Sequence, residues 1–514
     1  MAHKVNLDAL IPREDFDVSD TTIPAVQPST IQIRNLERAD FFYSVIRKPD
    51  FQRETSDWSP EKICDFIQSF IDGDLIPALI LWQSGSQIFV IDGAHRLSAL
   101  VAWVHNDYGD KETSRSFFDG IIPDDQTAAA AYTRKLIDRK VGSYADHQFA
   151  IQNPEKMKIE IVAQAKRLAS QSVQLQWVKG DATKAEASFF KINQQASPID
   201  KTELRLLKAR KLPNALAARA IVRSGTGHKY WSSFSAPVRS EVEEIAKYIN
   251  DLLFAPALKT PIKTLDLPVA GRGYSSQTLP LVFEFVNLAN EVRSDVSLQA
   301  DGSGEETLKF LRKCRVIVNR ISGNHASSLG LHPAVYFYSS TGRYQPTAFM
   351  AVIAMLIHFD KTSKFGDFTR SRQAFETFIV KHRKFVNQVT LKYGSGAKGY
   401  ARLKDLFLWL LDRLSENQSE ATILSEMSKH PEFSFLQPTE QDDLTRHADF
   451  GTDAKSSVFL RDALKDPLRC AICGGLIHRN SISVDHIVRR AEGGKGEIEN
   501  GQLTHPYCNT TVKN

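Results

Sequence analysis

Two pairs of metal-ligand residues near the end of the chain constrain its fold more than any other feature. Cys470 and Cys473 form a C-x-x-C pair, and His505 and Cys508 form an H-x-x-C pair that begins 32 residues after Cys473. Thiolates and an imidazole in two such pairs suit a closed, tetrahedral zinc site. A segment this short buries little apolar surface, so we expect a structural zinc ion to hold it folded.

Between the two pairs the sequence carries a second set of polar residues. Asp485 and His486 lie in a run flanked by hydrophobic residues, a glycine-rich turn follows, and Asn500 and Asn509 come later. The segment resembles the HNH endonucleases, ββα-metal nucleases with the pattern C-x-x-C, D-H, N and C-x-x-C-N. His505 departs from that pattern by replacing a cysteine, but histidine is an equally good zinc ligand.

The resemblance implies a catalytic role for each of these residues. Hydrolysis of a phosphodiester needs an activated water and a cation that absorbs charge on the leaving oxygen. His486 would be the general base, while Asp485, on the opposite face of the strand, and Asn509 would bind Mg²⁺ or Mn²⁺. Asn500 would hold the loop after His486. The family implies DNA as the substrate, although the chemistry itself does not exclude RNA.

An alternative is a regulatory protein whose zinc module binds DNA without cutting it. The D-H, N and C-N elements occur in register, which favours the nuclease. One further imidazole, His478, lies in the hairpin after the first zinc pair. We expect it at the surface rather than among the ligands.

A second motif lies near the start of the chain, where a strand runs into a helix. Residues 76–82 and 87–91 are short apolar runs typical of strands, and the second leads into Asp92-Gly93-Ala94-His95-Arg96 and the helical pattern of residues 97–103. Glycine at such a turn allows close approach of the backbone, and a helix N-terminus favours an anion. The Arg96 guanidinium suits a phosphate, and His95 can titrate or donate a proton. Taken alone, an ordinary capped helix would look the same.

Two further stretches place this loop in a context. The sequence D-F-Q-R at residues 50–53 precedes Trp58 and an amphipathic helix over residues 60–70, and F-K-I-N at residues 190–193 precedes Pro198 and an E-L pair. In this order they resemble the N-terminal domain of GmrSD-type modification-dependent restriction enzymes, which has a ParB/sulfiredoxin-like fold. His95 stands where that family often has glutamine.

The resemblance implies that the D-G-x-x-R loop binds a nucleotide or a nucleic-acid phosphate. Several members of the superfamily hydrolyse nucleoside triphosphates, so GTP or ATP is a candidate ligand and NTPase activity a candidate activity. The residues implied for this site are Asp92, Gly93, His95 and Arg96, with Gln52, Arg53 and Asn193 as further contributors. Asn193 has an equal alternative as a helix cap before Pro198. The alternative for the whole loop is contact with DNA phosphate in a nuclease that uses no nucleotide.

The middle of the chain, residues 206–436, is predicted to be α-helical. Apolar residues recur at helical spacing over residues 204–221, 242–254, 279–292, 308–321, 347–358, 375–389 and 403–414. In the segment 330–339, His332 is expected to be packed rather than catalytic.

A basic stretch in this region is a candidate DNA-binding surface. Its seven cations lie on either side of a short glycine-rich loop: Lys381, Arg383, Lys384, Lys392, Lys398, Arg402 and Lys404. Basic side chains on a flexible loop can follow a phosphate backbone. An equally good alternative is a solvated helix face that balances acids nearby.

Composition limits the class of protein. The 514 residues are 42% hydrophobic and 24% charged, and the net charge of +5 permits nucleic-acid binding without requiring it. Five cysteines, three of them in the zinc set, fit a reducing cytoplasm, with Cys64 and Cys314 as core thiols. The chain has no signal-like start and no run of 18 apolar residues, so we expect a cytoplasmic protein with no membrane partner.

We therefore expect an α+β protein in five parts. These are an irregular lead-in over residues 1–30, a ParB-like sensing domain over 31–205, an α-helical domain over 206–436, a linker over 437–457 and an HNH nuclease domain over 458–514. The combination resembles bacterial restriction or anti-phage systems in which sensing of a nucleotide or of modified DNA gates a nuclease against foreign DNA. A homo-oligomer and a companion defence protein are both left open.

Overall fold

The computed structural model contains two compact units, residues 1–208 with 274–276 and residues 209–273 with 277–514. Most of it is helical, and the strands of the described residues form a six-stranded sheet and a two-stranded hairpin. No helix in this described part is long and apolar enough to cross a bilayer. The residues that the structure describes are 4–14, 27–49, 52, 55, 58–117, 122, 124–196, 205, 209, 211–225, 231, 233–273, 278–292, 298–438 and 450–513.

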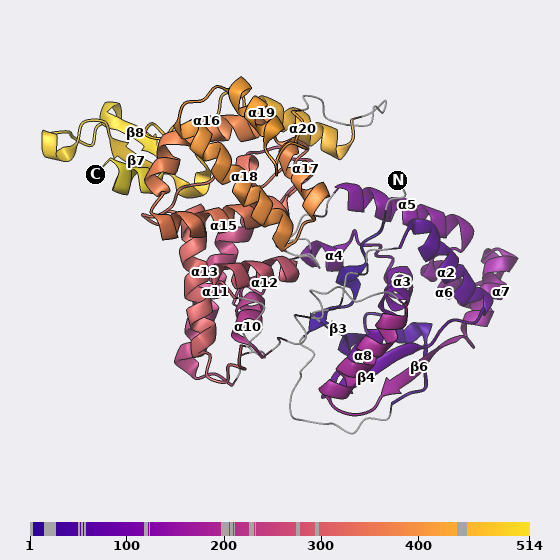
Figure 1. Cartoon of the computed structure of the whole chain (residues 1–514). Helices are drawn as coiled ribbons and strands as arrows, with labels where there is room; N and C mark the ends of the chain where they lie inside the picture. The colour runs from indigo at the N-terminus through magenta and orange to yellow at the C-terminus, as the bar shows by residue number, and fades with distance from the viewer. Residues whose placement is uncertain are drawn as a thin grey trace. The chain divides into compact units, whose positions relative to one another are not determined.

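The first unit is built on a mixed six-stranded sheet (Figure 1). Its strands, in spatial order, are β1 (Arg13–Glu14), β3 (Ile46–Pro49), β5 (Gln87–Asp92), β4 (Leu79–Ser84), β6 (Ser172–Val178) and β2 (Thr30–Gln32). β4 and β5 form an antiparallel hairpin at the centre, with β3 parallel to β5 and β6 parallel to β4. β1 pairs in parallel with β3 at one edge, and β2 pairs antiparallel with β6 at the other.

Both faces of this sheet are covered, which explains why β5 is apolar along most of its length. Phe89 and Ile91 pack with Phe189 of helix α8 (Ala182–Ala196). Val90 points the other way and joins the main core, to which α2 (Pro60–Asp72) and α3 (Ala94–His105) contribute. Successive side chains on a strand alternate between its two faces, so a strand covered on both sides needs apolar residues at successive positions.

The elements predicted around the D-G-A-H-R loop are present. The strand over residues 87–91 and the helices over 60–70 and 97–103 are confirmed as β5, α2 and α3. The strand predicted over 76–82 begins only at Leu79, because Pro77 has no N–H to give to a strand ladder. The first unit also contains α1 (Phe41–Val45), α4 (Glu112–Phe117), α5 (Asp124–Lys140), α6 (Tyr144–Gln152) and α7 (Ile159–Leu168).

Of the segment predicted to be an irregular lead-in, residues 5–11 contribute to the core of the first unit. Val5 and Leu7 are buried, and so is Asp8 between them and β1. The Asp8 carboxylate accepts hydrogen bonds from Lys48 Nζ at 2.5 Å and from Arg13 Nε at 2.9 Å. Burial alone would raise the pKa of Asp8, but the charges of Lys48 and Arg13 hold it well below its usual range. A buried ion pair therefore fastens this segment to β3.

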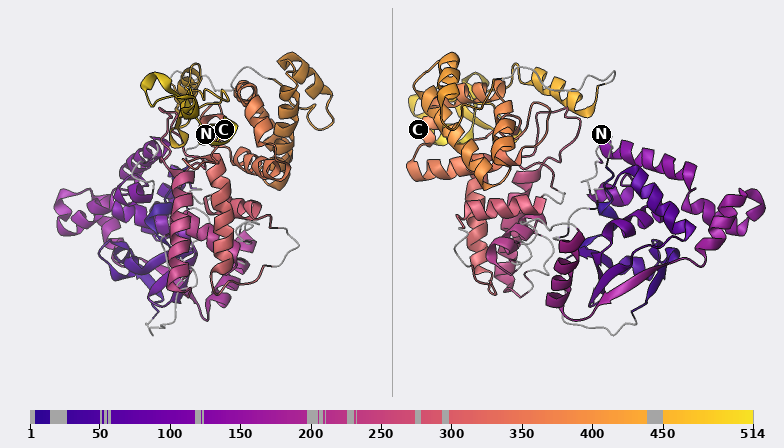
Figure 2. Two further views of the ribbon diagram at one scale, coloured as in Figure 1. Left: turned by 90° about the vertical axis from the view of Figure 1, so that its left-hand side faces the viewer. Right: turned by 45° about the vertical axis from the view of Figure 1, so that its right-hand side comes forward.

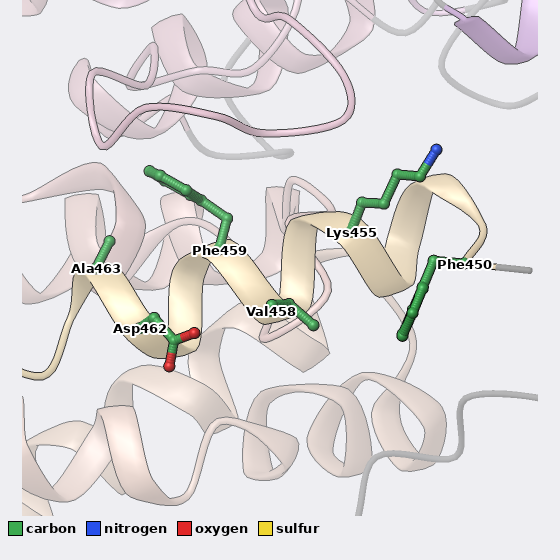
Figure 3. Close-up of a pocket in the computed structure, with 6 residues that line it drawn as sticks. All are labelled: Phe450, Lys455, Val458, Phe459, Asp462 and Ala463. Carbon is green, nitrogen blue, oxygen red and sulfur yellow. The ribbon is translucent and has the colours of Figure 1, made fainter.

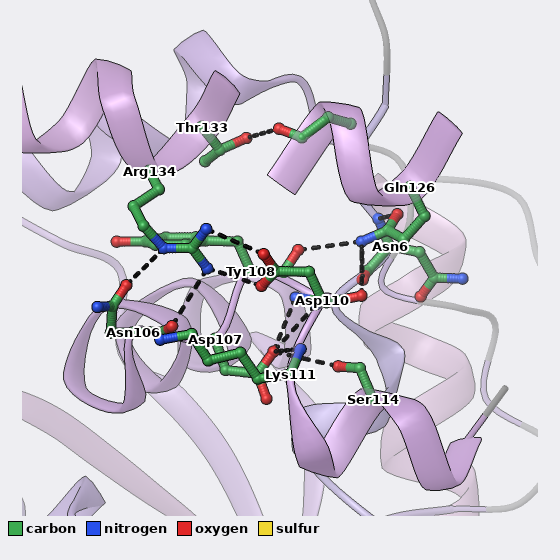
Figure 4. A network of polar contacts seen from close by, with 12 residues as sticks. Asn6, Asn106, Asp107, Tyr108, Asp110, Lys111, Ser114, Gln126, Thr133 and Arg134 are labelled. Carbon is green, nitrogen blue, oxygen red and sulfur yellow. Dashed lines mark hydrogen bonds and ion pairs between the residues drawn. The ribbon is translucent and has the colours of Figure 1, made fainter. Parts of the chain in front are cut away.

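A polar network holds the turn between α3 and α4 (Figure 4). The buried Asp107 carboxylate accepts hydrogen bonds from the backbone N–H groups of residues 109–111 and from the Ser114 hydroxyl. Arg134, on α5, donates to both carboxylate oxygens of Asp110 at 2.7 and 2.9 Å. The network ties the C-terminal end of α3 to α5, while the N-terminal end of α3 follows directly from β5.

The second unit is a helical body that carries the hairpin at its C-terminal end. Its longer helices in the described ranges are α10 (Pro213–Val222), α11 (Ala236–Phe254), α12 (Thr278–Ala289), α13 (Glu305–Ile321), α15 (Pro346–Thr362), α16 (Phe365–Lys381), α17 (Lys384–Tyr393), α18 (Ala397–Ser415), α19 (Glu420–Lys429) and α20 (Thr452–Ala463). The long helices α11 and α13 lie side by side (Figure 1, Figure 2). The short helix α14 (Pro333–Tyr336) follows His332, which is buried as predicted.

Two of the predicted helices need correction. The helix predicted over residues 375–389 is two helices, because α16 ends at Lys381 and α17 begins at Lys384. Both helices pack against α18, so the apolar spacing continues across the break and does not reveal it. In the stretch predicted as one helix over 204–221, Arg205 is helical, residues 211–212 form a turn, and α10 begins at Pro213, where proline suits the first position of a helix. Most of residues 204–210 lie outside the described ranges.

The segment predicted as a linker, residues 437–457, is described only in part. Residues 439–449 lie outside the described ranges, and the last part of the segment forms the start of α20. Helix α20 buries Leu460, whereas Phe450 and Val458 are exposed and line a pocket (Figure 3).

Candidate active site and metal centre

The four predicted metal ligands come together in the second unit. The ligand atoms of Cys470, Cys473, His505 and Cys508 all lie within 4.8 Å of one another, and all four side chains are buried. A tight turn places the first two, because the Cys470 backbone exchanges hydrogen bonds with the glycines at 474–475 that follow Cys473. The cluster could hold a structural metal ion such as zinc.

A hydrogen bond at the second ring nitrogen of His505 orients the ring for metal binding. Its Nδ1 lies 3.3 Å from the Cys473 sulfur and 3.9 Å from the Cys508 sulfur. Its Nε2 lies 3.0 Å from the carbonyl oxygen of Leu476. Because a carbonyl can only accept, the ring proton is on Nε2 and the Nδ1 lone pair is available to a metal. Three sulfurs and such a nitrogen are a donor set that fits zinc.

The thiols of the cluster do not titrate independently. Hydrogen bonds with Cys473 and Cys508 hold the pKa of Cys470 well below the usual thiol range. Hydrogen bonds with Cys470 and Cys473 raise the pKa of Cys508. The protons of the cluster therefore belong to the coupled set rather than to one thiol, and a thiolate is the form that binds a metal.

The predicted catalytic pair lies on a short antiparallel hairpin next to the metal ligands in sequence. β7 (Ser483–His486) pairs with β8 (Gly501–Thr504), and β8 runs directly into His505. Asp485 lies opposite Gln502, and His486 lies opposite Gly501. Adjacent residues on a strand point to opposite faces, so the Asp485 carboxylate and the His486 imidazole lie on different sides of the hairpin.

Asp485 is buried and held by two donors. Gln502 Nε2 donates to its Oδ2 at 2.9 Å, and Lys513 Nζ donates to the same oxygen at 2.7 Å. Burial by itself would raise the pKa of this carboxyl, but the hydrogen bonds from Lys513 and Gln502 lower it. Asp485 is therefore ionised at neutral pH, and a divalent ion at its Oδ2 would have to displace the Lys513 ammonium.

His486 is half-buried, and its Nε2 accepts a hydrogen bond. Arg490 Nε donates a long hydrogen bond to His486 Nε2 at 3.4 Å. That bond uses the Nε2 lone pair, which places the proton of a neutral ring on Nδ1. Lys513 also donates to the backbone carbonyl of His486. Nε2 is therefore the atom of His486 that can take up a proton.

Of the two predicted asparagines, Asn500 directly precedes β8 in the sequence and Asn509 follows it. Asn500 holds the loop after His486, because its Oδ1 accepts from the N–H of Val488 at 2.7 Å and its Nδ2 donates to the carbonyl of Lys495 at 2.8 Å. Asn509 Nδ2 donates to Ser483 Oγ at 2.7 Å and so connects the helical turn Cys508–Val512 to β7. The catalytic roles of these residues stay predictions.

A pocket along the hairpin is lined by several of these residues. Its lining residues are Val484, Asp485, His486, Gly496, Glu497, Ile498, Asn500, Gly501, Gln502 and Leu503. Three of the four predicted catalytic residues belong to this set, and Asn509 does not. Ile498 and Val484 are 91% and 67% exposed, so apolar side chains flank the candidate catalytic pair.

The surface position predicted for His478 is wrong. His478 is only 2% exposed. Its ring packs edge-on against the ring of His332, with the ring centroids 5.3 Å apart. Within the described part of the chain neither ring nitrogen of His478 has a hydrogen-bond partner. Leu476 and Ile477, the residues before it, are buried as well. The chain after the first zinc pair therefore packs against the helical body.

Acid is therefore expected to destabilise the protein through His478. Burial lowers the pKa of His478 to about 4, with Asp266 raising it and Arg479 lowering it by smaller amounts. The unfolded chain takes up this proton below about pH 6.5. The stabilising contribution is thus complete above that pH and is lost as the pH falls toward 4. In urea unfolding at pH 7 and pH 5, wild type should lose about 2 kcal/mol more stability than His478→Phe. Equal losses in the two proteins would contradict this prediction.

The D-G-A-H-R loop joins β5 to α3 in the first unit. Gly93 precedes the helix with a φ of +94°, and a Cβ there would overlap the side chain of Leu79. Arg96 Nη2 lies 2.7 Å from Asp92 Oδ2, and Arg96 Nη1 donates to the carbonyl of Pro77 at 2.8 Å. The Arg96 guanidinium is already paired, so an anion bound here would share it with Asp92.

Trp58, which belongs to the sequence motif but was not predicted as a site residue, lies beside this loop. Trp58 stacks on His95 with the ring centroids 5.8 Å apart and an angle of 23° between the rings. Lys62 Nζ lies 4.8 Å from the centroid of the Trp58 ring, on the first turn of α2. The structure thus brings an aromatic ring to the loop, and a cation lies over that ring.

The remaining residues predicted for this site are only partly described. Gln52 is buried, and its Nε2 donates to the carbonyl of Val90 at 3.4 Å, two residues before Asp92. Arg53 and the side chain of Asn193 lie outside the described residues. The assignment of all these residues to a nucleotide site stays a prediction.

The seven predicted DNA-binding cations do not form one unpaired positive surface. Three are paired with acids: Lys381 with Glu420, Lys404 with Asp405 and Arg402 with Glu432. Arg383 donates to two backbone carbonyls, and Lys392 Nζ lies 3.9 Å from the ring centroid of Phe435. For Lys384 and Lys398 the described residues supply no ion pair. This arrangement favours the alternative, a helix face balanced by nearby acids, and DNA binding here stays a prediction.

The buried Cys₃His cluster and the hairpin with an adjacent Asp-His pair define a metal-stabilised module with a candidate hydrolytic site. Residues 470–514 match the family model of the HNH endonuclease, and residues 33–210 match that of the GmrSD restriction endonuclease, N-terminal domain. The chain therefore joins a GmrSD N-terminal domain to a C-terminal HNH endonuclease domain, as the motifs predicted. The two domains support a nuclease of restriction type with DNA as its substrate. Comparison with curated proteins and with solved structures gives no match.

Proposed function

We propose that this protein is a metal-dependent DNA endonuclease of a restriction or anti-phage defence system, in which the N-terminal domain gates cleavage by the HNH domain. In this proposal residues 31–205 form a ParB/sulfiredoxin-like sensing domain and residues 458–514 a ββα-metal nuclease domain. The D-G-A-H-R loop at the end of β5 supports the first assignment. The β7–β8 hairpin followed by the helical turn Cys508–Val512 supports the second.

One observation carries the nuclease proposal. Asp485 and His486 are neighbours on β7, they belong to the lining of one pocket, and they point to opposite faces of the hairpin. A base and a cation ligand in such an arrangement can act on the two sides of one phosphodiester. The metal cluster next to β8 would hold the hairpin in this geometry.

In the proposed reaction His486 acts on the attacking water. Its Nε2 takes a proton from the water while the water oxygen bonds to phosphorus, and the bond from phosphorus to the leaving oxygen breaks with its electron pair on that oxygen. Asp485 and Asn509 would hold a divalent ion, whose positive charge would stabilise the leaving oxygen, and solvent would then protonate that oxygen. Because Lys513 and Gln502 both donate to Oδ2 of Asp485, an ion bound at that oxygen would have to displace the Lys513 ammonium.

For the N-terminal domain we propose a phosphate-binding site at residues 92–96, occupied by GTP or ATP. Arg96 and the N-terminus of α3 favour an anion there, and Lys62 adds a second positive charge. In this proposal, hydrolysis of the nucleotide serves only to control DNA cleavage by the HNH domain. We assign no residue of the loop to a specific step of that hydrolysis.

Two alternatives predict different behaviour. A DNA-binding regulatory protein with a non-cutting zinc module would bind DNA but never cut it, and the presence of both His486 and Asn509 argues against it. A nuclease that uses no nucleotide would cut at a rate that GTP and ATP do not change, with the D-G-A-H-R loop contacting only DNA phosphate.

Replacing Arg96 separates gating from simple DNA contact. The Arg96→Ala variant removes a charge-assisted hydrogen-bond donor, so we expect nucleotide affinity to fall by about 10- to 100-fold. Cleavage of plain and phage-modified plasmid DNA with Mg²⁺ should then lose its dependence on GTP or ATP. Arg167→Ala is the matched control, because Arg167 forms an exposed ion pair with Asp72 in the same unit. A uniform loss of DNA affinity, with no nucleotide effect in wild type, would instead support the nucleotide-independent nuclease.

A further inference from the structure

Helix α16 carries a buried ion pair directly behind the metal cluster. Arg372 and Glu376 lie one helical turn apart and are 1% and 0% exposed. Arg372 Nε donates to Glu376 Oε1 at 2.7 Å. Taking two charges out of water costs more than their attraction returns unless further hydrogen bonds satisfy both groups. The question is therefore what else each of them holds.

Arg372 reaches from α16 to a metal ligand. Its Nη1 lies 3.2 Å from His505 Nδ1 and also donates to the carbonyl of Leu329. Its Nη2 donates to the carbonyl of Gly330 at 2.9 Å. Burial would lower the pKa of Arg372, but Glu376 and Cys473 raise it above the usual arginine value. A permanent positive charge therefore lies against the ligand nitrogen and the thiols.

Glu376 completes the link through the residue that orients His505. Its Oε2 accepts the backbone N–H of Leu476 at 2.8 Å, and its Oε1 accepts the Tyr336 hydroxyl at 3.0 Å. The carbonyl of Leu476 is the group that holds His505 Nε2. One buried acid of the helical body thus holds the residue whose carbonyl sets the tautomer and direction of a metal ligand.

The turn between the first two ligands and Leu476 is shaped to receive this pair. A Cβ at position 475 would overlap the guanidinium of Arg372, so only glycine leaves room for it. The contact is therefore part of how the C-x-x-C turn and α16 fit together.

We propose that Arg372 and Glu376 are positioning residues of the metal centre. Together they hold His505 and the 470–476 turn in the geometry that binds zinc, and Arg372 supplies the countercharge of the centre. Three thiolates and one divalent ion carry a net charge of minus one, which an adjacent guanidinium balances. When a metal takes the Nδ1 lone pair, Arg372 keeps Glu376 and the carbonyls of Leu329 and Gly330 as partners and stays beside the thiolates. The proposal concerns the metal cluster alone and does not depend on DNA cleavage.

The affinity of the full-length protein for zinc tests this proposal. It is measured by competition with a chromogenic chelator, and the absorption spectrum of the cobalt(II)-substituted protein reports the ligand geometry. Arg372→Gln removes the charge at similar length, and we expect it to bind zinc about 10- to 100-fold more weakly. Arg370→Gln is the matched control on the same helix, because the Arg370 side chain is 74% exposed and pairs with Asp367. Its zinc affinity should equal that of wild type.

The outcomes separate clearly. An Arg372→Gln protein with wild-type zinc affinity and an unchanged cobalt spectrum overturns the proposal. If circular dichroism shows that Arg372→Gln does not fold, Arg372→Lys decides, since lysine keeps a cation beside Glu376 but lacks the fork that reaches two carbonyls. Weaker zinc binding by Arg372→Lys supports the positioning role of the guanidinium fork, and unchanged binding overturns that role and leaves Arg372 as a countercharge only. Neither measurement uses DNA, so the proposed nuclease can stand or fall independently.

Discussion

The His486→Ala variant is expected to cut DNA roughly 100- to 10,000-fold more slowly than wild type, which is the range that a positioned general base contributes. The substitution removes the one imidazole among the residues that line the pocket along the hairpin, and with it the Nε2 lone pair. The side chain is half-buried on a short strand, and its hydrogen bond among the described residues goes to Arg490 and not to a metal ligand. We therefore expect zinc content and DNA affinity to stay unchanged. Single-turnover cleavage of plasmid DNA with Mg²⁺ measures the effect.

His325→Ala is the matched control for this experiment. His325 is an exposed histidine of the same unit, and its ring bonds only locally, to Ser327. It should cut at the wild-type rate. Cleavage by His486→Ala within a few-fold of wild type would remove His486 from the mechanism. A wild type that cuts none of the DNA substrates would make the HNH module a zinc-stabilised binding element.

Loss of the metal is expected to have a still larger effect, because it should unfold the hairpin as well as stop cleavage. The small apolar cluster around the site consists largely of the ligands themselves, Cys470, Cys473 and Cys508, with Ile477. Structural zinc sites of this size contribute about 10–16 kcal/mol of apparent binding free energy. In Cys470→Ser, or after chelation, we expect loss of zinc and of all cleavage. Zn²⁺ together with Mg²⁺ should restore the chelated wild type, and Mg²⁺ alone should not.

Cys64→Ala separates this effect from the loss of any buried cysteine. Cys64 is fully buried in the main core of the first unit, far in sequence from the cluster. Its replacement should lower the stability of that unit and leave the zinc content of the protein unchanged. A chelated wild-type protein that still cuts DNA with Mg²⁺ alone would show that the cluster is dispensable.

The parts of the site that follow from local spacing could be read from the sequence. The four metal ligands lie in two short pairs, and the opposite faces of Asp485 and His486 follow from the two-residue period of a strand. The D-G-A-H-R loop was placed correctly between a strand and a helix, because the apolar run of β5 gives way to a helical period within a few residues.

The contacts that join distant segments could not be read in this way. Arg372 and Glu376 have the spacing of an ordinary exposed ion pair on a helix, and their partners Leu476 and His505 lie 100 residues or more further along the chain. For the same reason the sequence left open whether the basic stretch is paired, since the acids at 420 and 432 that pair with two of its cations come later in the sequence. His478 looked exposed because its burial depends on His332, on a different element.

The hydrogen bonds between α16 and the metal cluster also affect how much of this chain has to be transferred when the nuclease domain is fused to another protein. A gene fragment that encodes only residues 458–514 would carry every metal ligand and every predicted catalytic residue. It would leave the Leu476 N–H without Glu376 and would expose the turn at 474–475 that is shaped around Arg372. The unit that can be moved between proteins is therefore larger than the motif, and grafting this nuclease onto another scaffold requires α16 to travel with it.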